Sequence, residues 1–408
     1  MRTLRLTEYQ RCYGICLTDD DVAALRRLGS KIEVARSLDR PGAFDLTATS
    51  WIGVIELEGV AIEIRPKVPL DHILFMISYS LNRRGWDTNE ADLEPSDSLV
   101  EAVARLYASD VQRAIRRGVL HGYRLEEAAL PVVRGRLLFD EQIRRRFGRF
   151  PPAEVRYDDF TVDIIENQLI KAALTRLGQL RLRSARTKRA LTALQGVFRM
   201  VTPVAFLDHQ LPDVTYTRLN EHCRAAVELA RLILRSTAFD VRRGTIQATA
   251  LLVDMNQVFE DFVVVSLREA LGATERTFPQ GAHDRSLLLD QAGSFRLQPD
   301  LSWWTNGYCR FVGDVKYKRL EGDARNADLY QLLTYAIAAN LDDAMVIYAD
   351  GEAGRRVHEI RHVNKRLHVL ALDLSQPPRD IMGQIHAIAG QIVGMAIPHA
   401  TIKARSAS

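Results

Sequence analysis

Hydrophobic and polar residues alternate along much of the first 70 residues, a pattern typical of strands with one buried face. Gly and Pro interrupt the alternation at intervals, as they do between strands. Residues 51–68 predict a hairpin that turns near Glu58 and Gly59. We therefore expect the chain to begin with a β-rich part.

A helical period of apolar residues follows this alternation. It predicts helices over residues 70–85 and 96–118, with Ser96 or Asp97 as the N-cap of the second. Residues 160–240 are predicted to be mainly helical. The middle of the chain is thus expected to consist largely of helices.

The last third of the chain predicts a mixed α/β order. From about residue 248 the pattern indicates a helix (251–271), two strands, a helix (326–340) and three further strands. Pro377 and Pro378 end this unit, and an amphipathic helix follows. Its apolar face is formed by Ile381, Ile385, Ile388, Ile392 and Met395.

The break "RFPPAEV" is the preferred domain boundary. We expect an α/β (α+β) chain in four parts, which are a β-rich and helical domain (1–157), a helical connecting region (158–245), an α/β core (246–380) and a C-terminal amphipathic helix with a tail (381–408). The length of 408 residues is enough for about two or three domains.

Composition places the chain among soluble globular proteins, with 47% hydrophobic and 26% charged residues. The start has no signal-peptide pattern, and no stretch approaches the ~20 apolar residues that span a bilayer. We therefore expect a cytoplasmic protein. The four cysteines, Cys12, Cys16, Cys223 and Cys309, are too few and too scattered to predict a disulfide framework or a structural zinc site.

One segment matches a metalloprotease pattern. Residues 358–362 read "HEIRH", but H-E-x-x-H binds zinc only on a helix, where both imidazoles share a face. The alternation of Val357, Glu359 and Arg361 with His358 predicts a strand instead. A zinc protease therefore remains only a weak alternative.

Net charge is +4, but arginines gather in three clusters between residues 113 and 189. The clusters are Arg113, Arg116 and Arg117; Arg134, Arg136, Arg144, Arg145, Arg146 and Arg149; and Arg181, Arg183, Arg186, Lys188 and Arg189. Such clusters bind phosphate backbones or acidic partners, although each one alone is more typical of a solvated helix face. DNA and a protein partner both remain open as their target.

The stretch "LQPDLSWWTNGYCRFVGDVKYK", residues 297–318, brings candidate catalytic residues together. Strand periodicity puts Asp314 and Lys316 on one face and Val315 on the other. A turn centred near Asn306 and Gly307 would bring Asp300 close to Asp314. Two adjacent carboxylates favour a bound cation, and Mg²⁺ suits carboxylates that also face a phosphate oxygen. Asp, Asp and Lys would then suffice for phosphodiester cleavage.

This pattern alone is weak, since a solvated hairpin edge also carries acids and lysines. Its context strengthens it, because the preceding helix offers Glu260 and the following one begins with Tyr330 and Gln331. Helix, strand, turn, strand, helix is the order of the PD-(D/E)xK nuclease core. The chain has no P-loop, no G-x-G-x-x-G after a strand and no G-x-S-x-G elbow, so we expect it to bind no nucleotide.

Ordered segments along most of the chain resemble the McrC family, the nuclease subunits of McrBC modification-dependent (type IV) restriction systems. They are "WIGVIELEGVAIEIRPKV", "VRGRLLFDEQI", "YDDFTVDIIENQLIKAAL", "FEDF", "LQPDL", "DVKYK" and "DLYQLLTYA". The resemblance implies a C-terminal PD-(D/E)xK core in which Asp300, Asp314 and Lys316 are catalytic. It also implies that Glu260 helps to hold the metal and that Gln331 supports the site. Val315 stands where many relatives have alanine.

The resemblance further implies Mg²⁺ as cofactor and DNA carrying 5-methylcytosine-type modification as substrate. It implies a partner, a McrB-like AAA+ GTPase that is contacted by the N-terminal part of the chain and uses GTP. A non-cleaving adaptor that binds and stimulates such an NTPase is the alternative. Asp163 and Asn167, within the family-like segment, are interpreted as buried or capping polar residues.

Overall fold

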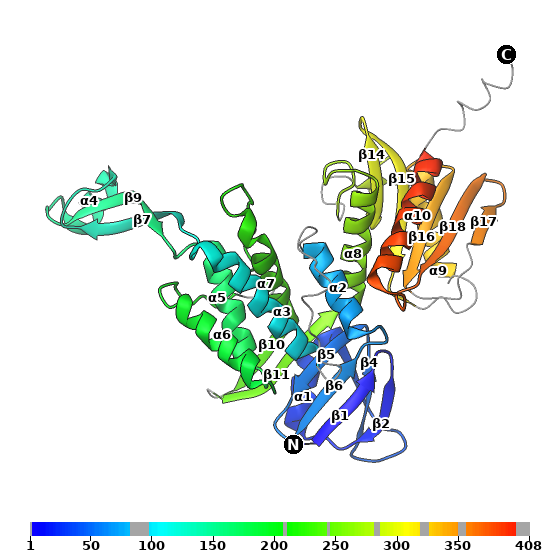
Figure 1. Cartoon of the computed structure of the whole chain (residues 1–408), viewed down its shortest axis with the longest axis horizontal. Coiled ribbons are helices and arrows are strands. Elements are labelled where there is room, and N and C mark those ends of the chain that lie inside the picture. The colour runs from blue at the N-terminus through cyan, green and yellow to red at the C-terminus, as the bar shows by residue number, and fades with distance from the viewer. Residues whose placement is uncertain are drawn as a thin grey trace. The chain divides into compact units, whose positions relative to one another are not determined.

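The computed structural model divides into two compact units. Residues 1–92 and 252–408 form the first unit, and residues 93–251 form the second. The division differs from the predicted boundaries after residues 157 and 245, because the two ends of the chain pack together. The structure describes residues 2–81, 98–206, 210–242, 245–280, 286–318, 326–349 and 356–396 (Figure 1).

The N-terminal part of the first unit contains the predicted strands. β6 (Val60–Arg65) pairs antiparallel with β5 (Trp51–Glu56), which confirms the hairpin, and parallel with β1 (Arg2–Thr7). A three-stranded sheet has the order β2 (Arg11–Ile15), β4 (Phe44–Ala48), β3 (Ile32–Arg36).

One helix within this part was not predicted. α1 (Asp19–Arg27) begins with a capping box, in which the Thr18 hydroxyl accepts from the Asp21 N–H and the Asp21 carboxylate accepts from the Thr18 N–H. Thr-x-x-Asp ahead of apolar residues is a readable helix start, but the surrounding strand alternation masked it.

The helix predicted over residues 70–85 corresponds to α2 (Leu70–Leu81), and residues 82–85 lie outside the described residues. α2 packs against α8 (Met255–Ala270), where Phe75 and Tyr79 meet the ring of Phe262 at centroid distances of 5.4 and 5.7 Å. This aromatic contact joins segments from the two ends of the chain into one core.

The C-terminal part of the first unit is built on a five-stranded mixed sheet, in the order β14, β15, β16, β18, β17. β15, β16 and β18 run parallel, while β14 and β17 pair antiparallel at the two edges. The strands are β14 (Leu301–Thr305), β15 (Tyr308–Lys316), β16 (Asp343–Ala349), β17 (Arg356–Ile360) and β18 (Lys365–Leu372).

Helices cover this sheet on both faces. α9 (Asn326–Ala338) packs on the face that presents Val312 and Val346, while α8 and α10 (Pro378–Ala396) lie together and contact β15 (Figure 1). All seven residues of β16 are buried, as expected for a central parallel strand between two layers. The predicted α/β order is confirmed, with short strands β12 (Leu287–Leu288) and β13 (Arg296–Leu297) added ahead of β14.

The start of one helix in this region was predicted wrongly. The helix expected from residue 251 begins at Met255, because β11 (Thr245–Asp254) pairs with β10 (Thr237–Arg242) and extends the chain up to Asp254. The carboxylate of Asp254 then caps α8 by accepting from the N–H of Asn256. The apolar run ahead of it lacked the period that separates a buried strand from a helix.

Four of the α-helices described in the second unit pack outside the β sheet of that unit's 122–161 segment: α3 (Leu99–Ala114), α5 (Ile165–Gly178), α6 (Ala185–Val197) and α7 (Arg224–Ser236). Ser98 caps α3, and the predicted caps Ser96 and Asp97 lie outside the described residues. Short 3₁₀ turns lie at Gly29–Lys31, Ile115–Arg117 and Glu221–Cys223.

The second unit also carries a β arm, defined as residues 122–161. It comprises β7 (Gly122–Leu130), β8 (Arg136–Leu137), α4 (Phe139–Arg146) and β9 (Ala153–Thr161), with β7 and β8 both paired to β9. The boundary predicted after residue 157 falls inside β9, so the arm and the following helices belong to one unit.

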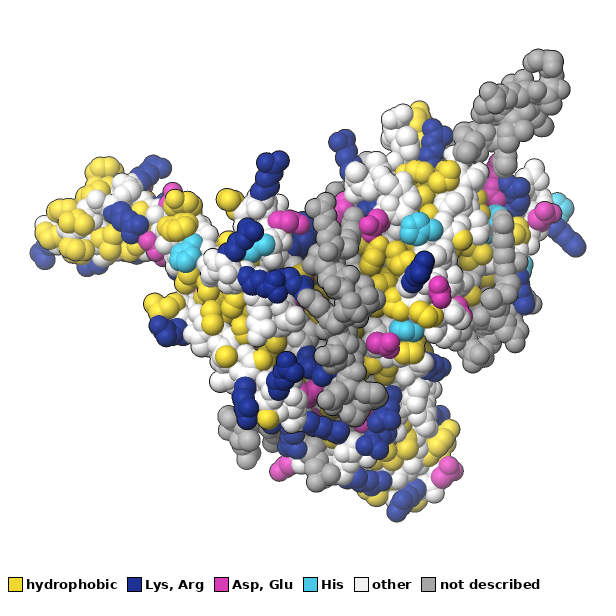
Figure 2. All heavy atoms as spheres, in the orientation of Figure 1, with side chains coloured by type: hydrophobic (Ala, Val, Ile, Leu, Met, Phe, Trp, Pro, Cys, Tyr) yellow, Lys and Arg dark blue, Asp and Glu magenta, His cyan; other side chains and the backbone are white. Residues whose placement is uncertain are grey.

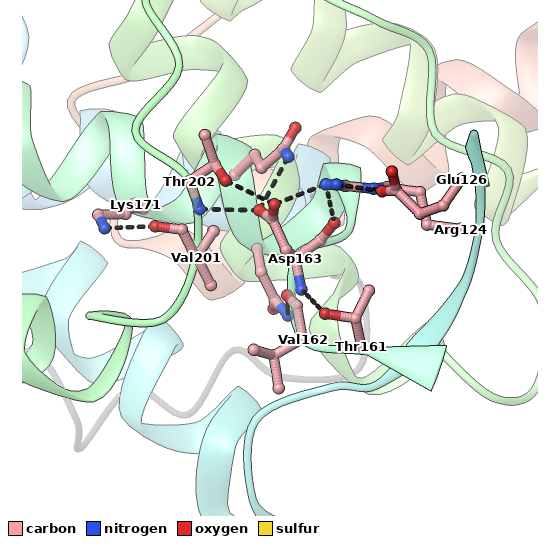
Figure 3. Close-up of polar contacts among 10 residues, drawn as sticks. Arg124, Glu126, Thr161, Val162, Asp163, Lys171, Val201 and Thr202 are labelled. Carbon is pink, nitrogen blue, oxygen red and sulfur yellow. Dashed lines mark hydrogen bonds and ion pairs between the residues drawn. The ribbon is translucent and has the colours of Figure 1, made fainter. Parts of the chain in front are cut away.

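Asp163 anchors the base of this arm (Figure 3). Its carboxylate accepts hydrogen bonds from the N–H and hydroxyl of Thr202, from Gln168 and from Arg124 of β7. Burial acts to raise the pKa of Asp163, but these donors outweigh it and hold the pKa far below its usual range. Asn167 donates to the carbonyls of Leu120 and Val162. Both residues are therefore buried polar groups with partners, as interpreted from the sequence.

None of the helices in the described residues has the length and apolar character needed to cross a membrane.

Candidate active site

The predicted hairpin forms as expected and positions the two aspartates. Asn306 (φ 51°) and Gly307 (φ 83°) take left-handed conformations at the turn, as tight β-hairpins require. Leu301 pairs with Gly313, so Asp300 lies beside Asp314, one residue further from the turn on each strand.

Gly313 permits a close approach of β15 to its parallel neighbour. A Cβ atom at this position would lie 2.7 Å from the carbonyl oxygen of Met345, closer than real Cβ contacts. The glycine thereby seats β15 against β16, and the next residue, Asp314, is fully buried in the sheet.

Asp314, Lys316 and Asp300 form a compact charged group. The Nζ of Lys316 lies 2.6 Å from Oδ2 of Asp314 and 3.9 Å from Oδ2 of Asp300. The Asp300 carboxylate also accepts a hydrogen bond of 2.9 Å from the N–H of Val315. Within the described residues, neither oxygen of Asp314 accepts a hydrogen bond of good geometry, although its side chain is 0% exposed. Asp314 is thus a buried carboxyl whose polar neighbours are a charged lysine and a second carboxyl.

The protonation of these acids is displaced from its ordinary range. Burial, reinforced by the adjacent Asp300, raises the pKa of Asp314 to about 7. Burial also raises the pKa of Asp300. Burial alone would lower the pKa of Lys316, but its ion pairs with the two aspartates outweigh this effect and raise it. A charged lysine among carboxyls that ionise reluctantly is typical of catalytic sites.

Glu260 lies on α8 and interacts electrostatically with Asp314 and Lys316. Burial raises its pKa to about 7, and the nearby negative charges of Asp261 and Asp314 add to the shift. The helix therefore brings a third carboxyl towards the hairpin, as predicted. In the described parts of the chain, however, no three His, Cys, Asp or Glu side chains converge closely enough to form a metal-binding group.

α9 contributes Gln331 and also Tyr335, which was not predicted. The Gln331 amide donates to the hydroxyl of Tyr335 (2.7 Å), and that hydroxyl donates to the carbonyl of Gln298 (3.2 Å). Burial raises the pKa of Tyr335 to about 12, with Asp314 and Asp300 adding to the shift. Gln331 is thus connected to the acids through Tyr335. The two residues lie one helical turn apart, and this spacing could have predicted their contact from the sequence.

The zinc-protease alternative fails on geometry. His358 lies on β17, and His362 lies in the following turn with a φ of 68°, so the two imidazoles do not share a helix face. The four cysteines are free thiols.

Some residues of the arginine clusters pair with acids of the chain, among them Arg113 with Asp110 and Arg134 with Asp159. Arg144 and Arg145 pair with Glu141, and Arg146 pairs with Glu154. The β arm instead exposes large hydrophobic side chains, visible over β7, α4 and β9 in Figure 2. They are Tyr123, Leu125, Val132, Val133, Phe139, Ile143, Phe147, Phe150 and Phe160. Exposed apolar side chains gathered on one element are typical of a protein interface.

A comparison with solved structures finds a chain of similar fold. One chain of the refined half-complex from a tetradecameric assembly of Thermococcus gammatolerans McrB AAA+ hexamers with bound McrC aligns with a TM-score of 0.56 and 18% identity. The alignment covers 96% of this chain and 100% of that chain. A chain of the cryo-EM structure of the Thermococcus gammatolerans McrBC complex is 20% identical, with a TM-score of 0.42 and coverage of 66% of this chain and 88% of that chain.

No curated protein matches the sequence. A family model described as "McrBC 5-methylcytosine restriction system component" matches residues 46–349, from β4 to the end of β16. Since the match spans well over half of the 408 residues, the chain belongs to this family of McrBC restriction components.

Proposed function

We propose that this chain is the DNA-cleaving subunit of an McrBC-type restriction system, a Mg²⁺-dependent endodeoxyribonuclease with a PD-(D/E)xK core. The observation that carries the proposal is Asp314, a fully buried carboxyl that lies 2.6 Å from the Nζ of Lys316 and beside a second carboxyl, Asp300. A structural aspartate in a core is normally satisfied by donors, as Asp163 is.

The donor set fits a hard divalent cation. Asp314 offers two buried oxygens, one of them paired with Lys316, and Asp300 and Glu260 add carboxyl oxygens nearby. All three have pKa values raised above the ordinary range, so they would gain stabilisation from a cation. Oxygen ligands of this kind suit Mg²⁺, with further positions left for water and a phosphate oxygen.

The chain's own residues have distinct roles in this proposal. Asp300 and Asp314 would hold the cation, with Glu260 approaching from α8. Lys316 would orient the attacking water and offset the negative charge that develops on the phosphate. Gln331 and Tyr335 would brace the carbonyl of Gln298, two residues before Asp300. A bound Mg²⁺ would supply Lewis acidity and lower the pKa of the attacking water.

We propose further that the chain works with a separate AAA+ GTPase. The structure that it resembles in fold is described as McrB AAA+ hexamers with bound McrC, which supports a partner of this class. The β arm offers a surface for it, because apolar side chains such as Phe139 (69% exposed) and Phe147 (88% exposed) lie among arginines. The family description supports DNA containing 5-methylcytosine as the target.

The proposal is tested by assembling the protein with its AAA+ partner, GTP and a plasmid that contains 5-methylcytosine. We expect double-strand cleavage with Mg²⁺ and none when Mg²⁺ is replaced by Ca²⁺ or removed by EDTA. Cleavage that persists at full rate in EDTA would contradict the metal-dependent mechanism.

A second function, the non-cleaving adaptor, is favoured by one observation, namely that the described carboxyls do not converge into a three-ligand metal group. The same assay separates the two functions. An adaptor would stimulate GTP hydrolysis by the partner and leave the plasmid intact at every Mg²⁺ concentration.

A further inference from the structure

Glu8 is a buried carboxyl outside the candidate active site. It follows β1, and its side chain is only 2% exposed. Oε1 accepts hydrogen bonds from the hydroxyl of Tyr317 and from the N–H of Lys67, both at 3.3 Å. Oε2 has no hydrogen-bond partner among the described residues. Burying a carboxyl with one oxygen unsatisfied costs stability, so its place calls for a reason other than packing.

The partner of Glu8 is the residue that follows the candidate catalytic lysine. Tyr317 is 6% exposed and comes directly after Lys316, the last residue of β15. Its carbonyl accepts a hydrogen bond from the hydroxyl of Tyr9 (3.4 Å). The turn after β1 thus contacts both the side chain and the main chain of Tyr317.

Tyr317 also contacts the helix that carries the third acid. Its ring lies 5.9 Å from the ring of Phe259, centroid to centroid, in a tilted arrangement. Phe259 is fully buried and immediately precedes Glu260 in α8. One tyrosine therefore lies next in sequence to Lys316 and against the neighbour of Glu260.

The position of Lys316 depends on contacts made beyond the end of its strand. Its pairing with Tyr348 is the last on the β15–β16 ladder, so no strand hydrogen bonds restrain the chain beyond it. The lysine side chain is long and flexible, and its usefulness depends on where its backbone is held. Lys318 pairs with Asp328 of α9, and Tyr317 is held by its contacts with Glu8, Tyr9 and Phe259.

We propose that Glu8 is a positioning residue for the nuclease centre, which holds Tyr317 and thereby sets Lys316 and Glu260 relative to Asp314. This inference rests on the proposed nuclease function. It goes beyond it by giving the N-terminal strands a part in catalysis.

The test compares Tyr317→Phe, Glu8→Ala and Glu8→Gln in the full assembly with the AAA+ partner, GTP and modified plasmid. We expect Tyr317→Phe and Glu8→Ala to lower the cleavage rate at saturating DNA about tenfold, since a displaced catalytic group loses rate rather than affinity. The KM for DNA and the GTPase rate of the partner should stay unchanged. Glu8→Gln keeps a side-chain acceptor for Tyr317 and should restore most of the rate.

A control is Tyr79→Phe, which removes another Tyr–Glu hydrogen bond of the same unit, from the buried Tyr79 to the exposed Glu269 near the C-terminal end of α8. It should leave cleavage unchanged. Wild-type rates in both Tyr317→Phe and Glu8→Ala would overturn the inference alone, and so would an equal loss in Tyr79→Phe that tracks a lower Tm. An inactive wild-type assembly with normal GTPase stimulation would instead remove the nuclease function, and this inference with it.

Discussion

At the scale of single residues, burial and charge work against each other at the hairpin. Asp314 is 0% exposed and Glu260 is partly buried, and burial is the main cause that raises the pKa of each to about 7. Ordinary carboxyls ionise near pH 4. The folded protein thus keeps protons on these groups that the unfolded chain has already released, which is a cost carried by the site rather than a source of stability.

The raised pKa values of Asp314 and Glu260 make the stability of the fold depend on pH. Between about pH 4 and 7 the folded state binds more protons at these two acids than the unfolded state does, so their contribution to the free energy of unfolding falls as pH rises. Asp314→Asn removes one such acid. We therefore expect the Tm of Asp314→Asn minus the Tm of wild type, both without divalent metal, to be larger at pH 8 than at pH 5.

Thermal unfolding at the two pH values in EDTA measures this difference. Asp343→Asn serves as a control, because Asp343 is a buried aspartate of the same sheet that is paired with Arg366 and His368 and whose pKa is lowered. Its variant should lose stability at pH 8. If the Tm of Asp314→Asn minus the Tm of wild type does not rise from pH 5 to pH 8, burial does not raise the pKa of Asp314.

At the scale of elements, the central hairpin was predictable because its signals are local. A turn with Asn306 and Gly307 fixes the register, and the period of two fixes which side chains share a face. The positions of Asp300, Asp314 and Lys316 follow from these two facts. Their catalytic and metal-binding roles remain predictions.

Elements that depend on distant partners were not predictable in the same way. The strand before α8 resembled helix because a buried apolar run has no distinctive period, and its pairing partner β10 decides the outcome. The contact of Glu8 with Tyr317 joins residues 309 positions apart, and no local sequence pattern predicts it. The capping box of α1 was readable and was overlooked.

A further prediction concerns Asp163, which holds the base of the β arm. Asp163→Ala would remove the acceptor that holds Thr202, Gln168 and Arg124 together. Because hydrogen bonds to a charged group contribute about 1.5 to 3 kcal/mol each, we expect a loss of at least about 2 kcal/mol in the free energy of unfolding.

Urea unfolding measures this loss, with Asp159→Ala as the control. Asp159 lies on β9 and pairs with Arg134 at the surface, with both side chains more than a third exposed, so its removal should change stability by less than about 1 kcal/mol. Equal effects of the two variants would show that Asp163 does not anchor the arm.

At the scale of the whole molecule, we propose that the β arm of one unit binds the partner and that the hairpin of the other unit cleaves DNA. The β arm carries its apolar side chains on the surface, and the candidate nuclease residues lie in the other compact unit. A change in the arm should therefore impair the assembly without altering the charged group around Asp314.

Phe147→Asn tests the arm. Phe147 is 88% exposed and has a φ of 51°, a conformation that Asn tolerates well, so folding should be unaffected. We expect weaker stimulation of the partner's GTPase and a matching loss of cleavage. Leu38→Asn, at a position 95% exposed in the other unit, is the control and should behave as wild type. Normal stimulation by Phe147→Asn would exclude this residue from the contact.

The most direct test of the central claim is the cleavage of modified plasmid by Asp314→Asn in the complete assembly with Mg²⁺ and GTP. We expect no cleavage by Asp314→Asn and normal stimulation of the partner's GTPase. The control Asp343→Asn should cleave at every Mg²⁺ concentration at which wild type cleaves. Cleavage by Asp314→Asn at the wild-type rate would contradict the assignment of this hairpin as the nuclease centre.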